Sequence, residues 1–209
     1  MKNRNGARCR VGMVLVAVWA VVVSPALPQA QGEPQMSAEQ KAQMEAWTKA
    51  MTPGKQHQDM AARTGTWEGS VSMWEAPGAP PQISQAHSER TMVLGGRVML
   101  DHWNGLMMGM PFEGMGMTGY DNADGKWWST WSDNFSTGVM TGVGNCEVDH
   151  KRGCTFAGTY TDPLTGKEKK NRSTVIWPSP DDERMEMFDI GADGKEWKTM
   201  EIVIHRVKK

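Results

Sequence analysis

The chain lacks any apolar run long enough to cross a membrane as a helix. Its most hydrophobic stretch, residues 11–23, is about a dozen residues long, whereas a membrane-spanning helix needs about 20. Four basic residues and no acidic residue precede this stretch, and small residues follow it at Ser24, Ala26 and Ala30. The arrangement is typical of a secretory signal peptide. We therefore expect residues 1–30 to be removed, with cleavage after Ala26 or Ala30.

The sequence also lacks an excess of positive charge. It holds 23 Lys and Arg against 24 Asp and Glu, and removing residues 1–30 leaves 19 against 24, a net charge of −5. Nucleic-acid binding depends on basic side chains that displace counterions from phosphates, so we expect no nucleic-acid partner. Cys9 precedes the apolar run, where a lipid-attachment cysteine does not lie. We therefore expect an unanchored, periplasmic or secreted chain of one domain, whose oligomeric state the sequence leaves open.

Motifs of the common enzyme classes are missing. The sequence contains no Gly-x-Ser-x-Gly, no glycine loop for phosphate and no zinc-protease helix signature, and its five histidines are scattered singly. Acidic residues such as Asp121 and Asp162 stand in turn sequences, where carboxylates commonly bond the nearby backbone. We expect a protein that is not an enzyme, with no catalytic residue, no resident metal and no cofactor.

Cysteine is scarce, with three in 209 residues. Once residues 1–30 are removed, Cys146 and Cys154 remain on either side of a polar turn. In an oxidising compartment this spacing predicts a disulfide bond across a hairpin. The alternative is a metal site that includes His150, although two sulfurs and one imidazole make an incomplete zinc shell.

Residues 31–64 are predicted to form two helices. Ser37 can cap the first helix, which ends at Pro53, and a second short helix follows over residues 55–62. Apolar side chains recur at spacings of three and four residues in the first helix: Met44, Trp47 and Met51. The simplest interpretation is that both helices pack on one end of the following domain, with His57 buried and hydrogen-bonded rather than serving as a ligand.

From Thr66 the hydrophobic period changes to two and predicts an all-β domain over residues 65–209. Turn signals divide this region at nine places: 77–81, 95–96, 109–111, 121–125, 134–138, 146–154, 162–166, 178–182 and 191–194. Nine turns imply about ten strands, and the short connections favour antiparallel pairing of sequence neighbours in an up-and-down meander. Closing such a sheet into a barrel removes its exposed edges.

The two ends of this region predict how the barrel closes. Gly65 and Trp67 open the first strand, and Arg206 closes the last, as in lipocalin-like barrels where a guanidinium lies on an indole face. Strand alternation places Trp67 and Arg206 on the same inward face. His205 then points outward, which makes it a poor candidate for a haem ligand.

Several long motifs carry a family resemblance. They are GTWEG, PFEGMGMTGYDNADGKWWSTWSD, GTYTDPLTG and the terminal GADGKEWKTMEIVIHR. In these motifs the chain resembles the bacterial domain-of-unknown-function family 1579, over about residues 57–206. The family is similar to the calycin, or lipocalin-like, superfamily, so the resemblance implies the same barrel. It implies no reaction and no catalytic residues.

A barrel of this size has a lumen, and its candidate lining is rich in methionine and tryptophan. Five methionines fall within residues 107–117. We take Trp103, Met115, Met117 and Trp128 as the candidate ligand-binding residues, although alternation turns Trp128 away from its neighbours Trp127 and Trp131. Methionine is an adaptable lining for apolar cavities. The leading hypothesis is therefore an exported protein that holds a small apolar or amphipathic molecule in its lumen.

Two alternatives stay open. Exported methionine-rich segments can bind Cu(I), a soft ion that favours thioethers, so residues 107–117 could form a copper site. Met107 and Met108 alternate in direction, and a compact site of three sulfurs would therefore need help from a turn. The other alternative is a structural or interaction protein whose lumen is filled by its own side chains.

Overall fold

The computed structural model describes residues 36–147, 153–191 and 194–208, so the predicted signal peptide, its cleavage site and His150 lie outside the described residues. Within these ranges two helices, α1 (Ala38–Met51) and α2 (Lys55–Ala61), precede ten strands. The strands are β1 (Gly65–Met73), β2 (Gln82–Val93), β3 (Val98–Met107), β4 (Met110–Asp121), β5 (Lys126–Asp133), β6 (Met140–Glu147), β7 (Gly153–Thr161), β8 (Glu168–Ser179), β9 (Asp182–Ile190) and β10 (Glu196–Arg206).

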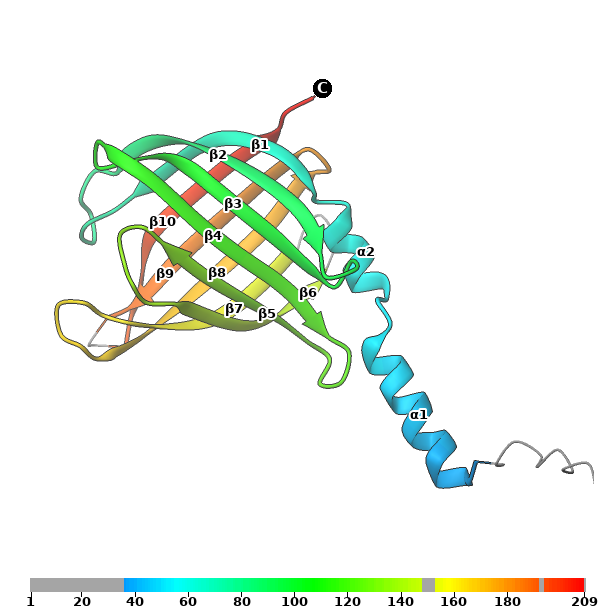
Figure 1. Ribbon diagram of the computed structural model, residues 1–209. Coiled ribbons are helices and arrows are strands. Elements are labelled where there is room, and N and C mark those ends of the chain that lie inside the picture. Colours follow the sequence, from blue (N-terminus) through cyan, green and yellow to red (C-terminus); the bar gives the residue numbers. More distant parts are fainter. Residues whose placement is uncertain (1–35, 148–152, 192–193, 209) are drawn as a thin grey trace, which may run out of the picture.

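The strands form one closed antiparallel barrel, as the sequence predicts (Figure 1). Each strand pairs with its neighbours in sequence, and β1 also pairs with β10, so the described sheet has no free edge. Figure 1 shows α2 at one end of the barrel, called here the α2 end, and the hairpin that joins β7 to β8 at the opposite end, called the far end. Because the strands are antiparallel, successive loops between them lie alternately at the α2 end and at the far end.

Helix α2 covers its end of the barrel. Met60 is 3% exposed and packs with Trp127 and Trp177 from the barrel interior. His57 is 5% exposed, and its Nδ1 accepts a hydrogen bond from the Gly54 backbone N–H at 3.0 Å. Burial lowers the pKa of His57, which favours the neutral ring. The prediction that His57 is a buried, hydrogen-bonded residue is confirmed.

Helix α1 does not pack on the barrel, and this part of the prediction is wrong. Figure 1 shows α1 leading away from the barrel, and Trp47 on its apolar stripe is 69% exposed. A capping box between Ser37 and Gln40 closes its first turn. At its other end the Asn122 side chain donates to the carbonyl oxygen of Thr52 at 2.8 Å. The first turn is therefore held by its own cap and the last turn by a barrel loop, while the apolar stripe predicted to be buried stays exposed.

The predicted contact between the first and last strands is present. The Arg206 guanidinium carbon lies 4.4 Å from the centre of the Trp67 ring, and Trp67 is fully buried. Arg206 also donates to the carbonyl oxygens of Thr64 and Ala62, the latter at 2.8 Å. Gly65 adopts a φ of 121°, and a Cβ at this position would lie 3.0 Å from Arg206 Nη1. Gly65 therefore gives the guanidinium room to reach the backbone before β1.

The predicted disulfide bond joins β6 to β7. Cys146 and Cys154 are directly opposite in the register, eight residues apart in sequence, and are bonded through their sulfur atoms. Both side chains pack against the buried cluster at the α2 end. In the part of the chain that the structure describes, no helix is long and apolar enough to cross a membrane.

Replacing Arg206 with alanine should lower the free energy of unfolding by about 2 to 3 kcal/mol, because it removes a cation–π contact and several charged hydrogen bonds. Chemical denaturation of both proteins measures the change. Arg184→Ala is the control, since Arg184 pairs with Glu186 and Glu201 on the outer surface and its loss should cost less than about 1 kcal/mol. Equal stability of Arg206→Ala and the original protein would show that the contact does not hold the barrel closed.

Thiol labelling of the unfolded, non-reduced exported protein should detect neither Cys146 nor Cys154, and should detect both after reduction. Because the linked loop is short, reduction should lower the free energy of unfolding by no more than about 3 kcal/mol. Two reactive thiols before reduction would show that the bond does not form in the exporting compartment.

Candidate functional site

Side chains fill the half of the barrel nearest α2. The large side chains here are at most 8% exposed: Trp67, Trp127, Phe156, Trp177 and Ile204. They form two apolar clusters, one that includes Met60 of α2 and the disulfide, and one built around Trp67 and Trp103. This half of the interior is a packed core.

A buried network of charges lies among these aromatic rings. Arg90 donates two hydrogen bonds to the Glu183 carboxylate, at 2.7 and 2.8 Å, and its Nε donates to Asp101 at 2.9 Å. Ser88 donates to the other oxygen of Asp101, and Trp177 Nε1 donates to Glu183 at 2.9 Å. The Arg90 guanidinium also lies 5.1 Å from the centre of the Trp67 ring. Both carboxylates are thus paired with one arginine and with neutral donors.

Burial and the charges in this network shift the pKa values of Arg90, Asp101 and Glu183. Burial on its own raises the pKa of Glu183, but the charge of Arg90 and the hydrogen bonds from Arg90 and Trp177 outweigh it and hold the pKa below its ordinary value. Burial raises the pKa of Asp101 above its ordinary value, although Arg90 and Ser88 oppose the shift. For Arg90, burial acts to lower the pKa, and the two carboxylates raise it well above its ordinary value. The Arg90–Glu183 pair therefore stays ionised at neutral pH.

The far half of the barrel is different, because inward-facing side chains there keep contact with solvent. The register turns these side chains toward the lumen, and all are partly exposed: Val71, Met73, Met107, Phe112, Trp131, Met140, Met187, Trp197 and Met200. Trp103, which is 6% exposed, lies below them and meets Trp131 edge to face at 6.5 Å between ring centres. We call this region the open half of the lumen, and it is the candidate functional site.

Few polar groups face the open half. The Tyr160 hydroxyl donates to Asp189 at 2.9 Å, and Trp131 Nε1 donates to Asp133 at 2.8 Å. Burial and the Asp189 carboxylate raise the pKa of Tyr160, so its hydroxyl stays protonated at neutral pH. Asn171 is 5% exposed and donates to the Met140 sulfur at 3.0 Å. The open half is therefore lined by apolar, partly exposed side chains with a small number of fixed polar groups.

Of the predicted ligand-binding residues, only Trp103 faces the lumen. Met115 and Met117 point outward and are 48% and 40% exposed. The residues that face inward on this part of β4 are Gly114 and Gly116, and a Cβ at Gly114 would overlap the Trp131 ring. The prediction that Met115 and Met117 line the lumen is wrong, because Trp131 takes the inner space and only glycine fits beneath it.

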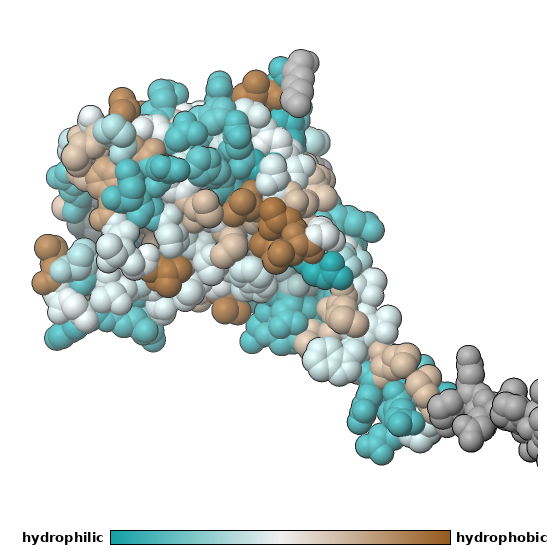
Figure 2. Space-filling model, in the orientation of Figure 1, coloured by the Kyte–Doolittle hydropathy of each residue, from teal (hydrophilic) through white to brown (hydrophobic). Residues whose placement is uncertain are grey.

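Trp128 lies on the outer side of the barrel, opposite to Trp127 and Trp131 as alternation predicts, so this candidate ligand-binding residue does not line the lumen. Its indole covers Gly119 on the neighbouring strand, where a Cβ would overlap the ring. It helps to line a shallow surface cavity together with Met51, His57 and Arg97. Figure 2 shows further apolar surface over the part of the wall where β2, β3 and β4 run side by side. The outside of the barrel thus carries hydrophobic side chains of its own.

Comparisons with known proteins identify the family. The family model described as "Protein of unknown function (DUF1579)" matches residues 52–206. The chain is a member of the DUF1579 family. The crystal structure of Rv2717c from M. tuberculosis resembles the DUF1579 chain with a TM-score of 0.57 and 14% identity, over 75% of this chain and 100% of that one. At that identity the likeness shows a shared barrel fold. A search of the curated proteins found no match.

Several inward residues of the DUF1579 barrel were not predicted from the sequence. Met185 and Met187 alternate with Arg184 and Glu186 along β9, a pattern of period two that marks an inward methionine face. The Arg90–Glu183 pair joins residues 93 positions apart, and no local pattern connects them. In the described part of the chain, no group of three or more His, Cys, Asp or Glu side chains is placed to hold a metal ion.

Replacing Glu183 with glutamine should lower the free energy of unfolding by about 3 kcal/mol at pH 7, because Arg90 then remains buried without its main partner. The folded-state pKa of Glu183 lies below the ordinary value of 4.5. Its contribution is therefore fully present above pH 4.5 and is lost as the pH falls through the lower folded-state value. The difference between the two proteins should shrink accordingly when denaturation is repeated at pH 3.

Glu186→Gln is the matched control for this experiment. Glu186 pairs with Arg184 and Lys198 on the outer surface, so its loss should cost less than about 1 kcal/mol at either pH. A penalty for Glu183→Gln that stays the same from pH 7 to pH 3 would show that the Glu183 charge does not support the fold.

Proposed function

We propose that the protein is an exported binding protein that holds a small apolar or amphipathic molecule in the open half of its lumen. The observation that carries the proposal is the partial exposure of inward-facing methionine and tryptophan side chains, among them Met187, Trp197 and Met200. These apolar side chains still contact water. Covering them with an apolar ligand removes that surface from water, which favours binding. The packed half beneath them closes the lumen toward α2.

The chemistry of the lining supports a flat or flexible apolar ligand. Methionine side chains adapt to ligands of different shape, and the rings of Trp131 and Phe112, which stack at 6.2 Å between centres, offer planar surfaces. The carboxylates of Asp133 and Asp189 accept hydrogen bonds from Trp131 and Tyr160 in this half, and the nearby Lys169 is paired with Asp162. Two carboxylates repel an anionic group, so we propose that the polar part of the ligand is neutral or positively charged.

Export and a non-catalytic role belong to the same proposal. The disulfide between Cys146 and Cys154 supports an oxidising compartment, in agreement with the predicted signal peptide and a periplasmic or secreted location. The buried charges of the DUF1579 barrel are tied to one another and lie below the open half, away from a ligand that would occupy it. A lumen filled by its own side chains is the competing structural role, and the exposure of the inward methionines argues against it.

The mature protein should bind one molecule of the neutral fluorophore N-phenyl-1-naphthylamine in a saturable titration. Ser173 lies inward between Phe156 and Met187, so Ser173→Trp should fill the cavity and weaken binding at least tenfold. Thr174→Trp adds the same ring to the outer face of the same strand and should leave binding unchanged. Circular dichroism confirms that both variants fold. Equal binding by all three proteins would place the fluorophore outside the lumen and overturn the proposal.

A matched pair of fluorophores tests the polar preference. The sulfonated analogue 8-anilino-1-naphthalenesulfonate should bind more weakly than N-phenyl-1-naphthylamine, and Asp189→Asn should narrow the difference. Native mass spectrometry of protein purified from its own exported compartment should reveal an added organic mass. Tighter binding of the sulfonated fluorophore would contradict the proposed preference while leaving the cavity in place.

A further inference from the structure

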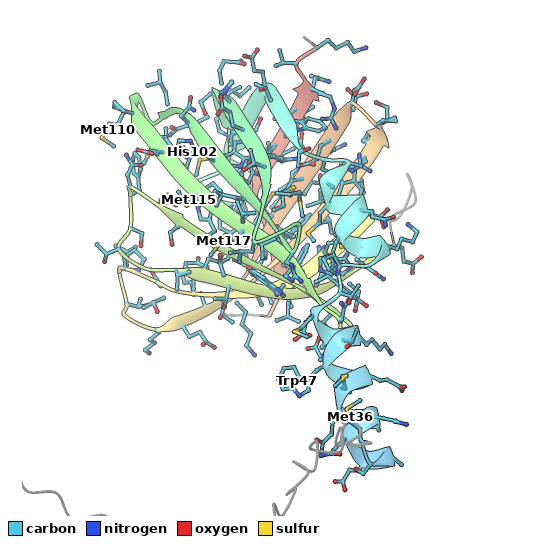
Figure 3. The ribbon with its side chains drawn as sticks, turned by 45° about the vertical axis from the view of Figure 1, so that its right-hand side comes forward. Met36, Trp47, His102, Met110, Met115 and Met117 are labelled. Atoms are coloured by element: carbon cyan, nitrogen blue, oxygen red, sulfur yellow. A yellow bond between two sulfur atoms is a disulfide. The ribbon has the colours of Figure 1, made fainter. Side chains whose placement is uncertain are left out.

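We propose that the outer face of β3 and β4 carries a Cu(I) site made by His102, Met115 and Met117. The site lies on the side wall of the barrel, outside the lumen, and is independent of the proposed ligand cavity. Figure 3 shows the three labelled side chains following one another along this wall. Of the five methionines in residues 107–117, only Met115 and Met117 supply sulfur ligands, and His102 on the neighbouring strand supplies an imidazole.

The register brings the three side chains together. His102 is directly opposite Met115, and Met117 follows on the same face of β4. Side chains directly opposite in an antiparallel pair have Cβ atoms about 5 Å apart, and diagonal neighbours lie about 7 Å apart. Methionine has three rotatable side-chain bonds. Both thioethers can therefore turn toward an ion held beside the imidazole without any change in the backbone.

The three donors are accessible, and a neighbouring carboxylate fixes the imidazole of His102. The side chain of His102 is 39% exposed, and Met115 and Met117 are 48% and 40% exposed. The His102 Nε2 lies 2.9 Å from a carboxylate oxygen of Glu113. A carboxylate only accepts hydrogen bonds, so Nε2 carries the proton and Nδ1 keeps the lone pair that binds a metal. Glu113 is thus a positioning residue for the imidazole.

The donor set selects the ion. Two thioethers and one imidazole are soft or borderline ligands, which favour Cu(I) over Zn²⁺, Ca²⁺ or Mg²⁺. The carboxylates of Glu89, opposite His102 in the register, and of Glu113 lie on the same outer face. Their charge attracts a cation and offsets the positive charge that Cu(I) brings.

Packing explains the glycines of this strand but not its methionines. Trp131 requires glycine at position 114, and a Cβ at Gly116 would lie 3.3 Å from the same ring. Met115 and Met117 belong to neither buried cluster of the described residues. Met110 does not join the site, because it lies at the far-end hairpin of β4, away from Met117 in Figure 3. A metal-binding role accounts for two outward sulfurs beside one outward imidazole.

The test is an anaerobic titration of the mature protein with Cu(I) in competition with the chromogenic chelator bicinchoninate. One equivalent should bind, and Met115→Leu, Met117→Leu and His102→Gln should each lower the affinity at least tenfold. Met44→Leu and Met51→Leu are the matched controls, because these methionines of α1 are also exposed, at 53% and 54%, and their replacement should have no effect. Glu113→Gln should weaken binding less than His102→Gln does.

A second measurement identifies the ligands directly. Ag(I), a redox-inert substitute for Cu(I), should shift the methyl NMR signals of Met115 and Met117 in protein carrying ¹³C-labelled methionine, and leave those of Met108 and Met110 in place. The absence of one-equivalent binding, or an affinity unchanged in the Met115→Leu/Met117→Leu double variant, would overturn the proposal. The double variant should still bind N-phenyl-1-naphthylamine, so failure of this site and failure of the lumen proposal are distinguishable.

Discussion

Arg206 reaches from the end of β10 over the indole of Trp67 to the carbonyl oxygens that precede β1, and the rest of the structure depends on this contact. It fixes the pairing of the first strand with the last. Once that pairing is set, the direction of every side chain follows from alternation along each strand. The inward position of the charged network, the floor of the lumen and the outward position of the methionines on β4 are all consequences of one closing register.

The interior that results has two halves with different physical roles. Under α2, aromatic rings and the Arg90–Glu183 pair form a core that is closed to solvent. Burying that ion pair is costly unless every donor and acceptor is satisfied, and here each carboxylate also receives a neutral hydrogen bond. In the far half the inward methionines stay partly exposed. Stability is thus concentrated at one end of the barrel, and an adaptable apolar surface remains at the other.

Much of this fold can be predicted from the sequence, because its signals are local. Turn residues mark the strand boundaries, Cys146 and Cys154 flank one hairpin, and parity alone relates Trp67 to Arg206. The candidate site is harder, since Gly-Met-Gly-Met alternates perfectly in either orientation, and hydrophobicity favours placing the methionines inside. Trp131 on the neighbouring strand determines that the glycines face inward, because its ring occupies the space over Gly114. The same kind of contact between strands turns Trp128 outward over Gly119.

The inner and outer methionines of the barrel should respond differently to oxidation. Conversion of a thioether to a sulfoxide makes a flexible apolar group polar. At Met60, which is 3% exposed within the α2 cluster, the added oxygen would have to be accommodated in a packed core. At Met115 and Met117, which are 48% and 40% exposed, the added oxygen could reach solvent, and a soft sulfur donor would become a hard oxygen donor while the barrel stayed intact. Oxidation would therefore modify the exposed methionines of the outer face before it modified the buried Met60 and destabilised the fold.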